Sequence, residues 1–169
     1  SLRESGVNAH YLGNVIMDCL RITGDDFGIE RSYPVVGIVP GSKEEAYRNL
    51  RTILRAVRVI FTQEMRKVNF LLALAPSLDP EKIAMSLPDG NVWRMQSATS
   101  EERKKGIIGD LVSPEGAVVK VIQGKFGDVV NLSTVVIGTA GLANEQAVGL
   151  GKPVVAFPGK GPQITSKFL

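Results

Sequence analysis

The stretch from Val135 to Gln163, VVIGTAGLANEQAVGLGKPVVAFPGKGPQ, constrains the fold more than any other part of the chain. Two apolar runs rich in β-branched residues, Thr134–Ile137 and Pro153–Phe157, are typical of strands that are buried on both faces. A helical pattern that ends near Leu150 lies between them, and Gly151 followed by Pro153 is a normal helix stop. Two buried strands joined by a helix form a βαβ crossover, which predicts parallel pairing.

The turn between the first strand and this helix consists of small residues, Gly138, Thr139, Ala140 and Gly141. Such a turn leaves the helix N-terminus bare, with free N–H groups and a partial positive charge, so it suits an anionic ligand such as phosphate. The alternative is that the small residues only let helix and strand pack closely. The turn alone does not decide between the two.

Polar side chains around this turn favour a ligand site. Asn144, Glu145 and Gln146 occupy the first turns of the helix, whereas Leu142, Ala143, Ala147, Val148 and Leu150 are expected to be interior. A carboxylate there is either a partner of the helix dipole or an acceptor for a pair of sugar hydroxyls. The loop Pro158–Gln163 follows the second strand and adds Lys160, Gly161 and Gln163. Ligands of open α/β sheets bind at this carboxyl edge.

The rest of the chain alternates strands and helices, which predicts an α/β domain with a mainly parallel sheet. Ser42 is expected to cap a helix from Pro40 to about Arg66, with Glu45 completing a capping box. Ser97–Lys105 is expected to be a loop. The other predicted elements are strands at Ala9–Gly13, Pro34–Val39, Asn69–Ala75 and Asn91–Gln96, helical segments at Asn14–Leu20, Asp79–Leu87 and Gly124–Leu132, and a hairpin or two edge strands at Gly106–Val112 and Ala117–Gln123.

The composition is that of an ordinary globular domain: 169 residues, 44% hydrophobic, 22% charged, net charge +3. The charge is too small to indicate a nucleic-acid partner. Cys19 is the single cysteine, which excludes an internal disulfide, and we expect it to be a small core residue. Asp25 and Asp26 lack a third ligand at calcium-loop spacing and are interpreted as turn acids, so no metal site is predicted.

The ends of the chain and its apolar runs suggest a cytoplasmic domain from a longer protein. No run approaches the roughly 20 residues needed to span a bilayer, and no signal peptide is recognised. The chain starts without methionine and the helical pattern of Ile164–Leu169 stops midway, so residues 1–169 are interpreted as one domain cut from a longer chain.

The first long helix carries a basic stripe opposite its apolar face. Arginines at helical spacing place their side chains together, either as a solvated surface or as a contact with an anionic membrane or lipid headgroup. The stripe consists of Arg48, Arg51, Arg55 and Arg58.

Four motifs, YLGNVIMDCL, VVGIVPGSKEEAYRNL, VVIGTAGLANEQAVGLGKPVVAF and PGKGPQ, occur in an order that resembles the C-terminal, nucleotide-sugar-binding domain of GT-B glycosyltransferases. Among these the chain is most similar to lipid-A-disaccharide synthase and its related branch. The resemblance implies a Rossmann-like sheet with helices on both faces, which is one half of a two-domain enzyme. The donor, typically UDP-GlcNAc, lies in the cleft, and no cofactor is needed.

The resemblance also assigns residues. Gly41, Ser42 and Lys43 match the loop that faces the diphosphate, with Lys43 in place of the usual arginine. Glu145 matches the residue that holds the donor ribose, although a longer spacing leaves Asn144 and Gln146 as rivals. Gln163 matches a glutamine near the donor sugar.

The general base is expected in the N-terminal half, so the isolated chain is expected to lack hexosyltransferase activity. A lipid-linked acceptor would place the protein at the inner face of a membrane. The alternatives are an epimerase that acts on UDP-GlcNAc and a non-catalytic nucleotide-sugar-binding module. A dehydrogenase is disfavoured because neither turn reads GxGxxG.

Overall fold

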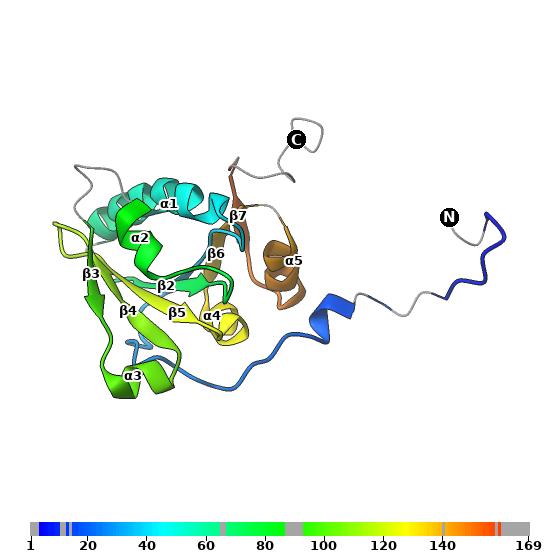
Figure 1. Ribbon diagram of the computed structural model, residues 1–169, viewed down its shortest axis with the longest axis horizontal. Coiled ribbons are helices and arrows are strands. Elements are labelled where there is room, and N and C mark those ends of the chain that lie inside the picture. The colour runs from blue at the N-terminus through cyan, green and yellow to red at the C-terminus, as the bar shows by residue number, and fades with distance from the viewer. Residues whose placement is uncertain are drawn as a thin grey trace.

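The computed structural model describes residues 4–10, 13, 15–64, 67–86, 93–139, 141–157 and 159. Within these residues seven strands form one sheet in the order β3-β4-β5-β2-β1-β6-β7 (Figure 1). β5, β2, β1, β6 and β7 are parallel, while β4 is antiparallel to both β5 and β3. The strands are β1 Val35–Val39, β2 Asn69–Leu74, β3 Arg94–Ser97, β4 Ile107–Val112, β5 Val118–Gln123, β6 Val135–Gly138 and β7 Val154–Ala156.

Helices cover both faces of this sheet. The helical elements are the 3₁₀ turn η1 Val15–Met17 and the helices α1 Glu45–Gln63, α2 Glu81–Ser86, α3 Ser100–Lys104, α4 Phe126–Leu132 and α5 Leu142–Gly149. α1 and α2 lie on one face, and α4 and α5 on the other. This architecture confirms the predicted Rossmann-like α/β fold with a mainly parallel sheet.

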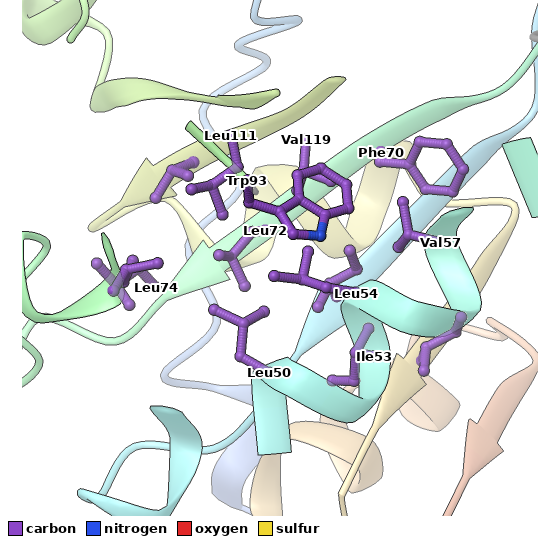
Figure 2. Close-up of a cluster of buried hydrophobic side chains, with 14 of the residues drawn as sticks. Leu50, Ile53, Leu54, Val57, Phe70, Leu72, Leu74, Trp93, Leu111 and Val119 are labelled. Carbon is purple, nitrogen blue, oxygen red and sulfur yellow. The ribbon is translucent and has the colours of Figure 1, made fainter. Parts of the chain in front are cut away.

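Two apolar cores explain why the central strands have no polar side. Figure 2 shows the larger core, in which Leu50, Leu54 and Val57 of α1 pack against Phe70 and Leu72 of β2. On the opposite face alternate residues of the same strands meet α4 and α5, through Val35, Val39, Leu71, Ala73, Val129, Val130 and Ala147. Each central strand therefore contributes apolar side chains to both cores, as is typical of buried parallel strands.

The direction of chain growth reverses between β1 and β6. α1 carries the chain from β1 to its neighbour β2, whereas α4 carries it from β5 back past β2 and β1 to β6. The loops that follow β1 and β6 therefore leave the sheet toward opposite faces. A crevice at such a switch point is the general ligand-binding place of open α/β sheets.

Several predicted elements are confirmed with shifted ends. β4 and β5 form the antiparallel hairpin, and β1, β2, β6 and α4 lie where they were predicted. α2 begins at Glu81, two residues after the start of the predicted segment Asp79–Leu87, and Leu87 lies outside the described residues. The predicted strand Asn91–Gln96 corresponds to β3, which begins at Arg94.

Two predictions about local structure are wrong, one about a helix cap and one about a loop. α1 begins at Glu45 and has no side-chain cap, so Ser42 is not its N-cap. The carbonyls of Lys43 and Glu44 accept from the N–H groups of Ala46 and Tyr47, so a tight turn follows Ser42 before the helix begins. The expected loop Ser97–Lys105 contains α3, which is held by a capping box between Thr99 and Glu102.

The predictions of burial near β7 are also wrong. β7 pairs only with β6 among the described residues, and Val155 is 54% exposed, so this strand is not buried on both faces. Leu142 and Val148 of α5, expected to be interior, are exposed. Ala147 is the buried residue of this helix. Cys19 is exposed rather than part of the core. No strand includes the described residues of Ala9–Gly13.

The segment that leads into the domain, residues 15–30 (the arm), runs along α5 and α4. The buried carboxylate of Asp128 in α4 accepts hydrogen bonds from the N–H groups of Thr23 (2.6 Å) and Gly24 (2.8 Å). Gly127 permits this approach, since a Cβ there would lie 2.0 Å from the carbonyl oxygen of Arg21.

The two aspartates of the arm are engaged in ion pairs. Asp25 pairs with Lys125 and Asp26 with Arg31, and these partners help to lower the pKa of each carboxyl. For Asp25 the hydrogen bond from Lys125 is the largest cause, and for Asp26 it is the N–H of Gly28. Both carboxylates therefore have structural partners, as expected for acids in a turn.

Candidate functional site: a cleft at the switch point

A cleft of about 470 Å³ opens at the carboxyl ends of β1, β2 and β6. Its walls come from five segments of the chain, which surround the point where the strand order reverses. The lining residues are Val39, Pro40, Gly41, Ser42 and Lys43 at and after the end of β1; Glu45, Ala46 and Asn49 of α1; Ala73, Leu74, Ala75 and Pro76 at and after the end of β2; Gly124 and Phe126 after β5; and Thr139, Gly141, Leu142, Ala143 and Gln146 around the start of α5.

Glycines shape both turns that border the cleft. Gly41 has φ +114° and Gly141 has φ +131°, conformations that side-chain-bearing residues rarely adopt. Gly138 serves a different purpose, because a Cβ there would lie 2.3 Å from Oδ1 of Asn144. The close-packing interpretation of the small-residue turn therefore fits Gly138, whereas Gly41 and Gly141 form the cleft wall.

A buried polar junction joins the two turns. The carbonyl of Pro40 accepts from Oγ1 of Thr139 and from Nδ2 of Asn49, each at 3.2 Å, and both donors belong to buried residues. Gly159 lies over this junction, since a Cβ there would be 2.6 Å from Cγ2 of Thr139. Gly159, the described residue of the predicted loop Pro158–Gln163, thus lies at the same edge of the sheet.

The cleft is electrostatically suited to an anionic group. Neither α1 nor α5 has a side-chain hydrogen bond at its N-cap, and the first residues of both helices line the cleft. The positive ends of both helix dipoles therefore face the cleft and favour negative charge. Lys43 and Glu45 are the charged residues among the described lining.

The structure brings half of the predicted site residues to the cleft. Gly41, Ser42, Lys43, Thr139, Gly141 and Gln146 line it. Glu145 is exposed and outside the lining, and Asn144 turns its Oδ1 toward Gly138, where the oxygen is buried without a hydrogen-bond partner among the described residues. Ala140, Lys160, Gly161 and Gln163 lie outside the described residues.

Sequence reasoning missed several lining residues. Asn49 could have been found, because an amide beside Leu50 on the apolar face of a helix needs a buried partner. Phe126 and Ala75 carry no such signal, since both look like ordinary packing residues. They reach the cleft only because β2 lies beside β1 and β5 lies beside β2, so that the carboxyl ends of these parallel strands share one edge.

The four arginines of the predicted basic stripe differ in their surroundings. Arg48 and Arg55 are exposed, whereas Arg51 and Arg58 are partly buried. The guanidinium of Arg58 binds both carboxylate oxygens of Glu115 in the β4–β5 turn, through Nε (3.0 Å) and Nη2. This pairing lowers the pKa of Glu115 to about 2. Arg58 therefore has a structural partner.

No group of three or more His, Cys, Asp or Glu side chains that could hold a metal ion occurs among the described residues. Likewise, within the described part of the chain no helix has both the length and the apolar character needed to cross a bilayer.

The fold and the cleft define a Rossmann-like α/β domain with a ligand crevice at its switch point. No family model matches the chain. It is 24% identical over 162 residues to a protein described as lipid-A-disaccharide synthase, from Syntrophus aciditrophicus (strain SB). The matching region covers 92% of this chain and 36% of that protein, so the chain spans about a third of the length of its relative. The match supports a distant relationship over this domain.

Proposed function

We propose that this domain is the donor-binding half of a glycosyltransferase that resembles lipid-A-disaccharide synthase. Its ligand is UDP-GlcNAc or a similar nucleotide sugar, and the reaction is hexosyl transfer. The observation that carries the proposal is the meeting of two helix N-termini without side-chain caps, those of α1 and α5, at the switch-point cleft. The similarity to a synthase over 92% of the chain supports it.

The diphosphate of the donor binds between the two glycine turns. Gly41, Ser42 and Lys43 lie on one side and Thr139 and Gly141 on the other. Backbone N–H groups donate to the phosphate oxygens, and Lys43 adds a positive charge without the planar fork of arginine. These donors stabilise the negative charge that develops on the leaving diphosphate when the glycosidic bond breaks.

The ribose and the donor sugar are assigned to the polar residues around α5 and in the loop Pro158–Gln163. Glu145 is the proposed ribose acceptor, with Asn144 and Gln146 as the alternatives in the same turn. Lys160, Gly161 and Gln163 are assigned to the donor sugar, and the packing of Gly159 against Thr139 supports a position of this loop near the cleft.

The other half of the full-length protein supplies the general base and the acceptor site, for a lipid-linked or other acceptor. Such a protein would work at the cytoplasmic face of a membrane. A nucleotide-sugar epimerase would use the same cleft for UDP-GlcNAc, and analysis of the products formed by the full-length protein distinguishes the two reactions.

Calorimetry of the 169-residue chain against UDP, UDP-GlcNAc, GDP and NAD tests the proposal. UDP and UDP-GlcNAc should bind, and GDP and NAD should bind at least about tenfold more weakly, a difference of about 1.4 kcal/mol. Lys43→Gln should weaken UDP binding, whereas Lys104→Gln, on the exposed surface of α3, should not. Equal affinity for all four ligands, or none for UDP, would contradict the assignment.

Glu145→Gln tests the ribose assignment. This change keeps the shape of the side chain but removes its charge, and a hydrogen bond to a charged group contributes roughly 1.5–3 kcal/mol. UDP affinity should fall about tenfold or more. If Glu145 only complements the helix dipole, the change should cost a few tenths of a kcal/mol in stability and leave UDP binding unaltered.

The comparison compound is 2′,3′-dideoxy-UDP, which lacks both ribose hydroxyls. The wild type should bind it poorly, and Glu145→Gln should barely distinguish it from UDP. A variant that still prefers UDP as strongly as the wild type does would exclude Glu145 and leave Asn144 and Gln146.

A further inference from the structure

The 3₁₀ turn η1 at the start of the arm is attached to a cleft residue. The amide nitrogen Nε2 of Gln146 donates to the carbonyl oxygen of Ile16 at 2.8 Å. Met17 lies over Gly149, where a Cβ would come within 2.5 Å of its sulfur. Because Gln146 also lines the cleft, one side chain connects the arm to the candidate site.

The hydrogen bond to Ile16 fixes the orientation of the Gln146 amide. A backbone carbonyl can only accept, so the NH₂ group must face Ile16 and Oε1 is left for another partner. No described residue donates to that oxygen. An amide oxygen accepts from a hydroxyl or an N–H and repels a phosphate oxygen. A ligand group that meets Oε1 of Gln146 is therefore a hydrogen-bond donor.

The arm contacts the helices at two separate places. Near Thr23 and Gly24 the buried carboxylate of Asp128 accepts two backbone hydrogen bonds, and Lys125 binds Asp25. η1 meets α5 through the hydrogen bond from Gln146 to Ile16 and through the contact of Met17, while Val15 is exposed. Removal of η1 therefore leaves the contacts of Thr23, Gly24 and Asp25 in the chain.

We propose that η1 positions Gln146 for ligand binding: the docked turn holds the amide so that Oε1 accepts from a hydroxyl of the bound nucleotide. Docking of η1 and binding of the nucleotide then stabilise each other, since coupling between two equilibria is reciprocal. The identity of the ligand rests on the proposed function, whereas the orientation of the amide rests on the contact with Ile16.

Calorimetry with UDP and with inorganic pyrophosphate tests the coupling. The variants are a chain that lacks residues 1–18, Gln146→Met, and their combination. Each single change should lower UDP affinity about fivefold, as expected for the loss of one hydrogen bond. The combination should be no weaker than Gln146→Met alone, because both changes remove the same interaction. Pyrophosphate, which has no hydroxyl of a sugar, should bind all four proteins equally.

A second pair of variants leaves the chain at full length. Gly149→Leu places a side chain where Met17 lies and should displace η1, with the same effect as the deletion. Val148→Leu adds bulk at the neighbouring exposed position, where Val148 is 62% exposed, and should have no effect. If Gly149→Leu fails to fold, the deletion variant decides.

The side-chain NH₂ signals of Gln146 in an NMR spectrum report the orientation without any activity. They are assigned by their absence in Gln146→Met, and they should shift both when η1 is removed and when UDP is added. The inference is overturned if η1 removal leaves these signals and UDP affinity unchanged, or if the penalties of the two changes add. Failure of the wild type to bind UDP overturns both this inference and the proposed function, whereas UDP binding without coupling overturns this inference alone.

Discussion

Asp128 is the residue whose replacement tests the attachment of the arm most directly. Its side chain is 1% exposed, and Oδ1 accepts from the N–H groups of Thr23 and Gly24. The other oxygen, Oδ2, lies 2.9 Å from the hydroxyl of Thr23. The two oxygens therefore have separate partners, which makes Asp128→Asn and Asp128→Ala informative as a pair.

The expected costs follow from these contacts. Asp128→Ala removes two charge-assisted hydrogen bonds from backbone N–H groups, of roughly 1.5–3 kcal/mol each, so we expect a loss of about 3–6 kcal/mol. Asp128→Asn keeps Oδ1 as an acceptor for both N–H groups, and its NH₂ can donate to Thr23. Neutral hydrogen bonds contribute roughly 0.5–1.5 kcal/mol, which is about 1–1.5 kcal/mol less than charge-assisted ones, so the loss over two bonds should be about 2–3 kcal/mol. In a domain of this size the midpoint of thermal unfolding should fall by roughly 13 °C for Asp128→Ala and roughly 7 °C for Asp128→Asn.

Urea and thermal unfolding measure these losses, and Thr23→Val is the matched control. It removes the hydroxyl contact but leaves both backbone donors, so it should cost less than about 1 kcal/mol. Hydrogen exchange reports the local event, because the amides of Thr23 and Gly24 should be protected in the wild type and unprotected in Asp128→Ala. Equal destabilisation by Asn and Ala, or fast exchange of these amides in the wild type, would refute the reasoning.

Three further predictions concern the cleft and the surface. Gly141→Ala should lower the free energy of unfolding by about 1–3 kcal/mol through backbone strain and should also weaken UDP binding. Gly151→Ala, at φ +71° outside the cleft, should lower stability only. Thermal unfolding measures the stability of each variant, and calorimetry measures its UDP affinity. The Arg58–Glu115 pair should stabilise the fold above pH 4.5 and lose this contribution as the pH falls toward about 2, because the folded-state pKa of Glu115 is lowered. Unfolding measured over that pH interval should show a smaller loss of stability in Arg58→Gln than in the wild type, and an equal loss would contradict the pairing. Replacing the three remaining arginines of the stripe, Arg48, Arg51 and Arg55, with Gln should weaken binding of the full-length protein to anionic vesicles, and the effect should be larger at low salt. Arg58→Gln should leave vesicle binding unchanged. Unchanged partitioning of the triple variant would favour a solvated surface.

The layered fold could be predicted because the central strands carry an unambiguous signal. β1, β2 and β6 are apolar on both faces and are followed by turn residues, and burial on both faces is what this composition requires. β7 has the same composition but lies at an edge, and Val155 is half exposed. An apolar composition shows that a strand can be buried on both faces. Whether it is buried depends on its position in the sheet, which the composition of the strand alone does not determine.

The place of the site could be predicted, but its lining could not. Sequence reasoning assigned a phosphate to the turn after β6 and, through the family resemblance, a diphosphate to the loop after β1. The contact of Thr139 with the carbonyl of Pro40 shows that these two turns meet. The strand order that adds Ala75 and Phe126 to the cleft is a long-range property. α3 is a different case: its capping box was present in the sequence, but the charged segment was interpreted as a loop.

The rotation of α5 about its axis decides which polar residue of its first turns faces the cleft. Ala147 is fully buried against the sheet, and Asn144 packs on Gly138, so these two residues fix the rotation. Residues two apart in a helix lie about 200° apart, which turns Glu145 away from the sheet. Gln146, about 100° from Ala147, lies on the flank that borders the cleft. Glu145 can therefore meet a ribose only where the ligand extends past the end of the helix, whereas Gln146 meets any ligand that fills the cleft.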